Sequence, residues 1–287
     1  MVMKKIIKAK VGRSVIGSTS NFLVLVIFGI FMIIPMVFII SNAFKPLDEL
    51  FMYPPRLFVR NPTTDNFSSL TTVFEDSWVP FSRYLFNTLI ITVITTFCKV
   101  IVATMAGYVL DKKRFPGRKL IFDLVITAML FTTTVTAIPN YLILSKLGWI
   151  DTYMSIIGPA LGASMGVFLV KQFMGNIPNS ILEAAMVDGA SEHRIFWTIV
   201  VPNVKPAWLT LIIFTVQDMW SVTGGTYIYS EELKTLQTAL NEIVSSGISR
   251  TGVSAAISLI MMIVPIAVFV LTQKNVVQTM MSSGIKE

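Results

Sequence analysis

The sequence predicts an all-α, polytopic membrane protein with six transmembrane helices. Of its 287 residues 54% are hydrophobic and only 14% are charged, whereas a soluble domain carries about 25% charged residues. The mean hydropathy is +0.72, and the apolar runs approach the roughly 20 residues that cross a bilayer as a helix. The short alternating segments of an outer-membrane barrel do not dominate. The fold class is therefore a helical membrane protein.

The six predicted spans share a mostly apolar core of membrane-crossing length. They cover residues 21–40, 84–110, 120–139, 152–170, 207–223 and 253–271. The first is too long for the roughly 7–15-residue apolar region of a secretory signal, so we expect it to remain as a span. The fourth is diluted by Pro159 and by glycines, which are common where membrane helices approach closely.

The distribution of basic residues predicts that both termini are cytoplasmic, with residues 1–20 forming the N-terminal cytoplasmic segment. Fifteen of the 23 Lys and Arg residues fall in the segments that this orientation places inside, and seven fall outside. Cytoplasmic loops of membrane proteins carry such an excess. The net charge of +7 is thereby explained by topology, and we expect no nucleic-acid partner.

A polar segment at residues 175–206, between the fourth and fifth spans, is predicted to hold a short helix. Ser180 and Glu183 have the spacing of a capping box, so the helix is expected to start there and to end near Asp188. Gly189 then offers a left-handed stop.

A second short helix follows in the same segment. Ser191 is placed to cap it, and Pro202 is expected to end or kink it. Ala184 and Ala185 keep the first helix slim, as a helix inserted into a groove of another protein requires. The alternative is an interfacial helix that touches only lipid headgroups. The charge of the segment argues against anionic lipid as its partner. It carries three acidic residues, Glu183, Asp188 and Glu192, and one arginine, Arg194.

The same segment resembles the cytoplasmic signature loop of ATP-binding-cassette importer permeases. The pattern E-A-A-x-x-D-G-A-x-x-x-x-x-F-x-x-I-x-x-P-x-x-x-P is matched by Glu183, Ala184, Ala185, Asp188, Gly189, Ala190, Phe196, Ile199, Pro202 and Pro206. Outside it, "NAFKPLDEL", "KKRFPGRK" and "PNYLILSKLGWIDT" resemble the carbohydrate branch, in particular the shorter permease of maltose-type systems. The ending "SSGIKE" departs from the family pattern in its terminal Glu287.

The resemblance implies a division of labour among subunits in a bacterial inner membrane. Residues 21–287 would form the transmembrane domain, paired with a second, related permease. Two cytoplasmic ATPase subunits and an extracytoplasmic solute-binding protein would complete the importer of a sugar or oligosaccharide. Residues 183–206 would contain the coupling helix that docks on an ATPase, with contacts expected from Glu183, Ala184, Ala185, Asp188, Gly189, Ala190, Phe196 and Pro202.

No enzyme activity, cofactor or metal is expected of this chain. It contains no G-x-x-x-x-G-K-[ST] phosphate loop, so ATP hydrolysis is expected in a partner. His193 is the only histidine and Cys98 the only cysteine, which argues against a metal site. The alternatives are an importer permease for a non-sugar solute, a secondary transporter or a membrane enzyme.

Two charged residues fall near the middle of predicted spans. Lys99 and Asp218 each lie about 16 Å above the inner surface, at 1.5 Å of helix rise per residue. Charges at that depth are costly unless paired or hydrated. They are expected to pair and fix helix packing, or to line a substrate path with Gln217, Trp220 and Ser221, or to be unrelated, with Lys99 snorkelling. An amide, a carboxylate and an indole suit a sugar.

Overall fold

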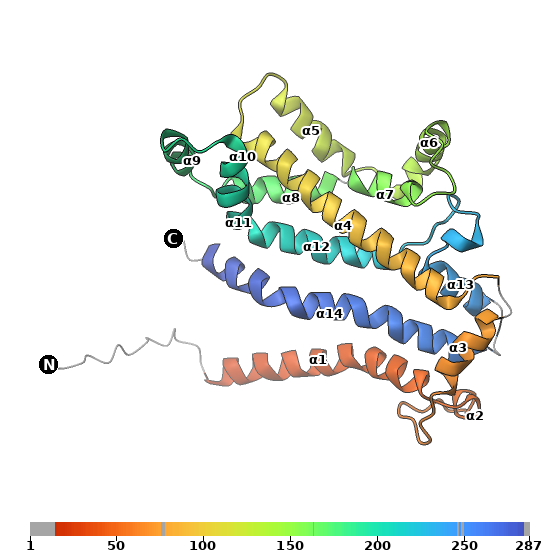
Figure 1. Ribbon diagram of the computed structural model, residues 1–287. Coiled ribbons are helices and arrows are strands. Elements are labelled where there is room, and N and C mark those ends of the chain that lie inside the picture. The colour runs from red at the N-terminus through yellow and green to blue at the C-terminus, as the bar shows by residue number, and fades with distance from the viewer. Residues whose placement is uncertain (1–14, 76–77, 163, 246, 248–249, 284–287) are drawn as a thin grey trace.

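A computed structural model describes residues 15–75, 78–162, 164–245, 247 and 250–283. Helices account for the regular structure of this part of the chain, which contains no β-strand (Figure 1). Four helices are long and apolar enough to cross a membrane, or up to six if each of two bent pairs forms one span. The all-α membrane class is thereby confirmed, while the count of six spans stays a prediction. Of the predicted N-terminal segment, residues 1–14 lie outside the described residues.

The long helices run side by side (Figure 1). They are α1 (Val15–Ala43), α4 (Phe81–Lys112), α12 (Lys205–Trp220) and α14 (Thr251–Ser283). α4 packs against α12 and against α7 (Met154–Leu161) and α8 (Ser164–Met174). α1 packs against α14, but none of its most apolar stretch is buried. The centre of the bundle is therefore α4, and α1 lies at its edge.

Small residues bring α4, α8 and α12 close together. A Cβ added to Gly107 would lie 2.9 Å from Val170 Cγ1, and one added to Gly166 would lie 3.1 Å from Leu211 Cδ1. Contacts shorter than 3.4 Å force neighbours to move. The glycines therefore set the helix spacing, as small residues do in membrane bundles.

Residues 120–139, predicted as one span, do not form one continuous helix, and whether the bent pair crosses the membrane as a single span stays a prediction. α5 (Arg118–Ala128) and α6 (Thr133–Lys146) meet at an angle of 113°. The break lies beside the threonine run that starts at Thr132, whose backbone is extended (φ −77°, ψ 155°). β-Branched side chains are poor helix formers, and their hydroxyls compete for backbone partners; Thr136 Oγ1 lies 3.3 Å from the Thr132 carbonyl oxygen.

The other predicted spans map onto helices with shifted ends. Residues 21–40, 84–110 and 253–271 lie within α1, α4 and α14. Residues 152–170 correspond to α7 and α8, which together form one 21-residue candidate. The last three residues of 207–223 lie beyond α12, which ends at Trp220.

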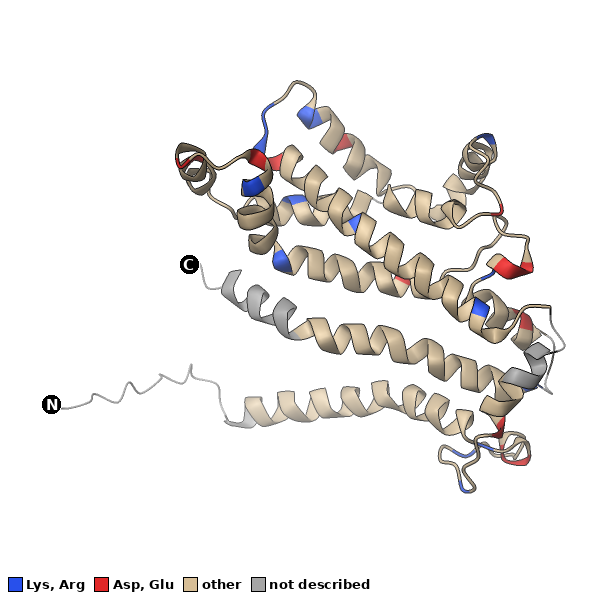
Figure 2. Cartoon of the chain, in the orientation of Figure 1, with Lys and Arg blue, Asp and Glu red and all other residues tan. Residues whose placement is uncertain are grey.

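The short elements gather at the two ends of the bundle. α9 (Asn179–Val187) and α10 (Glu192–Ile195) lie at the end where α1 begins and α14 finishes (Figure 1). α2 (Leu47–Leu50), α3 (Asp65–Glu75) and α13 (Leu236–Ser245) lie at the opposite end. Most charged residues also lie at the ends and in the loops, while the middles of the long helices are nearly free of charge (Figure 2).

Candidate coupling surface

The start of α9 differs from the predicted capping box. α9 begins at Asn179, and Pro178 occupies the cap position with φ −62° and ψ 135° and no side-chain cap hydrogen bond. Ser180 lies inside the helix, so it is not the cap, and Glu183 is exposed one turn further on. The ring of proline fixes φ near the value required before a helix, and this local restraint defines the start in place of the Ser180 hydroxyl.

The end of α9 follows the prediction for Gly189. This residue has φ +78°, and its N–H donates to the Met186 carbonyl at 3.1 Å. The Ala190 N–H donates to the Ala185 carbonyl at 3.0 Å. These two bonds form a Schellman motif, which satisfies the last free carbonyls of a helix. Gly189 is thus the turn residue between the two short helices.

The second short helix is also capped as predicted. Ser191 Oγ accepts a hydrogen bond from the Arg194 N–H at 3.3 Å. α10 continues through a π-helical turn, Phe196–Val200, into α11 (Val201–Asn203). The helical path therefore passes through Pro202, and the 74° bend falls between Asn203 and Lys205. Pro202 comes shortly after the π-helical turn, where the regular pattern of α-helical hydrogen bonds is already interrupted, and this explains why a residue without an N–H is tolerated within the helical path.

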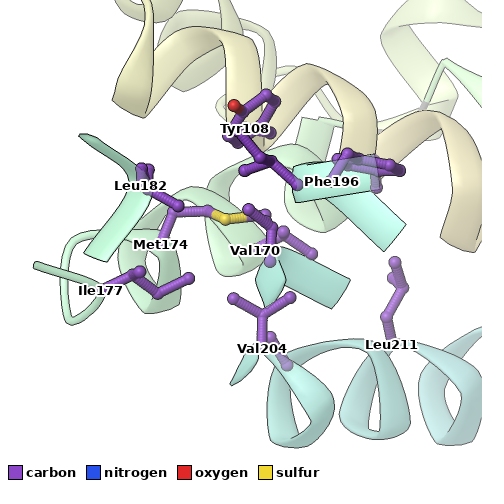
Figure 3. Packing of buried hydrophobic residues seen from close by; sticks show 12 residues of the cluster. Tyr108, Val170, Met174, Ile177, Leu182, Phe196, Val204 and Leu211 are labelled. Atoms are coloured by element: carbon purple, nitrogen blue, oxygen red, sulfur yellow. The ribbon is translucent and has the colours of Figure 1, made fainter. Parts of the chain in front are cut away.

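α9 has one face fixed to the bundle and one face open. Leu182 is 5% exposed and packs in an apolar cluster with residues of α4, α8 and α12 (Figure 3). Ala185 and Ala190 pack at the edge of this cluster. On the opposite face Glu183 and Ala184 are exposed, as is Val187, at 88%.

The structure therefore divides the predicted coupling residues into two groups. Glu183, Ala184, Asp188, Gly189 and Pro202 are exposed. Ala185 and Ala190 are half-buried, and Phe196 is buried with its ring 5.6 Å from that of Tyr108. Only the first group is available to a partner, and the second holds the segment in place.

Polar contacts that the sequence did not reveal tie this segment to the end of α4. Tyr108 donates its hydroxyl to Glu192 Oε2 at 2.9 Å, and Lys113 donates to Glu192 Oε1. Burial is the largest single influence and lowers the pKa of Lys113, but the hydrogen bonds and charges of Glu192 and Tyr108 together outweigh it, so the pKa of Lys113 is raised overall. Lys112 Nζ donates to the Ile177 carbonyl at 2.6 Å. The partners lie 65 to 84 residues apart in the sequence, so no local pattern indicates them.

The polar residues inside the predicted spans do not form a direct pair. Lys99 is 6% exposed and Asp218 is exposed. Within the described part of the chain neither has an ion-pair partner within 4.0 Å. Close by, the hydroxyls of Thr95 and Thr215 are buried on α4 and α12 without a hydrogen-bond partner among the described residues.

The three residues flanking Asp218 lie in different surroundings. Gln217 and Ser221 are exposed, and Ser221 Oγ donates to the Gln217 carbonyl at 2.5 Å. Trp220 is 2% exposed and donates its indole N–H to the Met261 carbonyl at 3.0 Å. Within this chain Trp220 therefore joins α12 to α14.

The fold is a helical membrane bundle with an exposed short helix held at one end by apolar packing, and the family comparison assigns this architecture to a class. Residues 99–282 match the family described as "Binding-protein-dependent transport system inner membrane component". This match covers well over half of the chain, which therefore belongs to that family.

The chain is also similar to named relatives. It is 27% identical over 254 residues to the arabinooligosaccharides transport system permease protein AraQ of Bacillus subtilis (strain 168), covering 88% of this chain and 90% of the relative. It is 32% identical over 200 residues to the putative ABC transporter permease protein ORF2 of Caldicellulosiruptor sp. (strain Rt8B.4), covering 69% of this chain and 67% of the relative.

A solved structure of a transporter chain shares the fold. A bacterial ABC transporter involved in the import of the acidic polysaccharide alginate contains a chain that superposes with a TM-score of 0.78. The identity is 23%, and the superposition covers 92% of this chain and 99% of the other. Together, family and fold make this chain a multi-pass permease subunit of the inner membrane, which is a transport component and not an enzyme.

Proposed function

We propose that the chain forms half of the translocation path of an importer for a sugar or oligosaccharide, and that α9 receives the work of ATP from a separate ATPase subunit. The observation that carries the coupling role is the open face of α9. Ala184 and Val187 are exposed there while Leu182 holds the opposite face in the bundle. The similarity to the arabinooligosaccharide permease, which extends over 90% of that protein's length, supports a saccharide as the solute.

The proposed importer contains two permeases, two ATPases and an extracytoplasmic binding protein. The second permease is expected to be a related but different chain. ATP would close the ATPase pair, and the docked helices would turn the permeases as rigid bodies between inward- and outward-facing states. Both chain termini would be cytoplasmic, in keeping with the position of α9 at the end where α1 begins and α14 finishes (Figure 1).

Reconstitution with the partner subunits tests this proposal. We expect saccharide uptake into proteoliposomes that requires ATP and the binding protein and survives collapse of the ion gradient. Ala184→Trp should abolish copurification of the ATPase, because the added bulk lies on the open face of α9. Asn241→Trp, which places the same indole side chain at an exposed position on α13, is the control. Uptake driven by an ion gradient alone would contradict the proposal.

A further inference from the structure

Two polar ties join the inner end of α4 to the chain on both sides of α9. We propose that Glu192 is the positioning residue through which a displacement of α9 reaches α4. The inference rests on the proposed docking of α9 to an ATPase, and it concerns how the resulting movement enters the bundle. We refer to Tyr108, Lys113 and Glu192 together as the coupling joint.

The first tie lies just ahead of α9. Lys112 Nζ donates to the carbonyl of Ile177 at 2.6 Å, two residues before Asn179 opens the helix. The Lys112 side chain is only 6% exposed and lies 3.1 Å from Asp111. Lys171 of α8 lies 3.8 Å from the same carboxylate. The entry to α9 is therefore fixed to α4 and α8.

The second tie, the coupling joint, lies just beyond α9. Glu192 opens α10 and is separated from the end of α9 by only the Gly189 turn and the Ser191 cap. Its two carboxylate oxygens accept from different groups, one from Tyr108 and the other from Lys113. Tyr108 belongs to the last turn of α4, and Lys113 is the C-terminal cap residue of that helix. The Glu192 carboxylate thus contacts α4 both at its side, through Tyr108, and at its end, through Lys113.

The apolar cluster beside the joint holds the segment against the bundle. Leu182, Ile195 and Phe196 pack against α4 and α8, and this burial is non-directional and roughly proportional to area. Hydrogen bonds have preferred lengths and angles. The two contacts of Glu192 therefore add a directional constraint between α10 and α4 to the packing of the cluster.

The exposure of the joint separates positioning from folding. The side chain of Glu192 is 53% exposed and that of Lys113 is 38% exposed. Ion pairs at such exposure add little to folding stability. Loss of Glu192 should therefore leave a folded chain, still held by the Lys112 hydrogen bond and the apolar cluster, in which a movement of α9 reaches α4 less completely.

α4 leads from the joint to the middle of the membrane. Tyr108 and Lys99 lie on this helix nine residues apart, about 14 Å along its axis at 1.5 Å per residue. A movement of the inner end of α4 is thus delivered to buried Lys99. The joint connects the exposed face of α9 to the polar residues of the predicted path.

The test compares variants of the joint in the complete transporter, reconstituted with its ATPase, second permease and binding protein. Glu192→Ala removes both contacts and Tyr108→Phe removes one. Glu192→Lys combined with Lys113→Glu reverses the ion pair. Glu242→Ala is the matched control, since Glu242 is 51% exposed and lies 2.7 Å from Lys234 at the opposite end of the bundle.

We expect Glu192→Ala to copurify with the ATPase and to melt at the wild-type temperature. The variant should transport about tenfold less sugar per ATP hydrolysed, a loss of the size typical for coupling between distant sites. Tyr108→Phe should show a smaller loss, the reversed pair should recover most of the coupling, and Glu242→Ala should match wild type.

Normal sugar transport per ATP in Glu192→Ala would overturn the inference, and so would loss of ATPase copurification, which would make Glu192 a docking residue. If Glu192→Ala fails to fold, the charge-reversed pair and Tyr108→Phe still test the inference. An unmodified transporter that neither binds nor uses the ATPase would instead overturn the proposed function.

Discussion

Gly189 is the residue whose backbone matters most to the coupling surface. It has φ +78°, and nothing lies within 4 Å of a Cβ built there. A substitution therefore costs conformational strain and not a steric clash. The left-handed region costs an ordinary residue roughly 1–2 kcal/mol, while asparagine visits it more readily.

We predict that Gly189→Val reduces the coupling of ATP hydrolysis to transport, because a β-branched residue disfavours the left-handed turn between α9 and α10. Gly189→Asn should keep most of the activity. The measurement is sugar transported per ATP hydrolysed in proteoliposomes. Equal behaviour of the two variants would show that the left-handed backbone is not what coupling requires.

A second prediction concerns Lys99 and Asp218. Since no ion pair within 4.0 Å joins them and only Lys99 is buried, exchanging the two charges should not restore what the single changes abolish. Lys99→Asp, Asp218→Lys and the double variant would be compared by the initial rate of sugar uptake. Recovery in the double variant would favour a pair that fixes helix packing.

At the scale of elements, local patterns predicted the features that local chemistry determines. The left-handed turn at Gly189 and the cap by Ser191 are both confirmed. The Ser180 cap was wrong because Pro178 competes for the same helix start. The bend between α5 and α6 was missed because the 120–139 run is apolar enough for one span, while its threonines weaken the helix. Glu192 was missed as a contact of Tyr108, 84 residues away.

The turn before α7 carries a pH-dependent contact. Asp151 adopts φ +58°, and its carboxylate accepts from the Ser230 hydroxyl at 2.5 Å and from the N–H groups of Ser230 and Tyr229, each at 2.9 Å. These hydrogen bonds lower the pKa of the Asp151 carboxyl, and the one from the Ser230 hydroxyl contributes most. The ionised form thus holds residues 229–230 against this turn.

We predict that Asp151→Ala speeds amide hydrogen exchange at Tyr229 and Ser230, while wild-type protection is equal at pH 7 and pH 5 after correction for intrinsic rates. A lowered carboxyl pKa stabilises the fold above the unfolded value of about 3.9 and loses this effect as pH falls through the lower folded value. Loss of wild-type protection between pH 7 and pH 5 would contradict the assignment.

At the scale of the whole molecule, the orientation of the bundle is a prediction from its basic residues and can be tested directly. Cys98 is the only native cysteine, so a Cys98→Ser chain provides a clean background. Val187 is 88% exposed on α9, and Tyr53 is 95% exposed between α2 and α3.

We predict that Val187→Cys reacts with a membrane-impermeant maleimide only after cells are permeabilised, whereas Tyr53→Cys reacts in intact cells with an open outer membrane. The reason is that α9 and the α2–α3 segment lie at opposite ends of the bundle (Figure 1). The reverse labelling would invert the orientation and would place α9 out of reach of a cytoplasmic ATPase.

The edge position of α1 has a consequence for the lipid around the protein. Its apolar stretch, Gly17–Ala43, has 27 residues, none of whose most apolar window is buried. At 1.5 Å per residue this stretch is about 40 Å long, against a hydrocarbon core of about 30 Å. A helix of that length tilts or thickens the surrounding bilayer. Because α1 packs against α14 along one side, the acyl-chain length of the host lipids acts on the contact between these two helices.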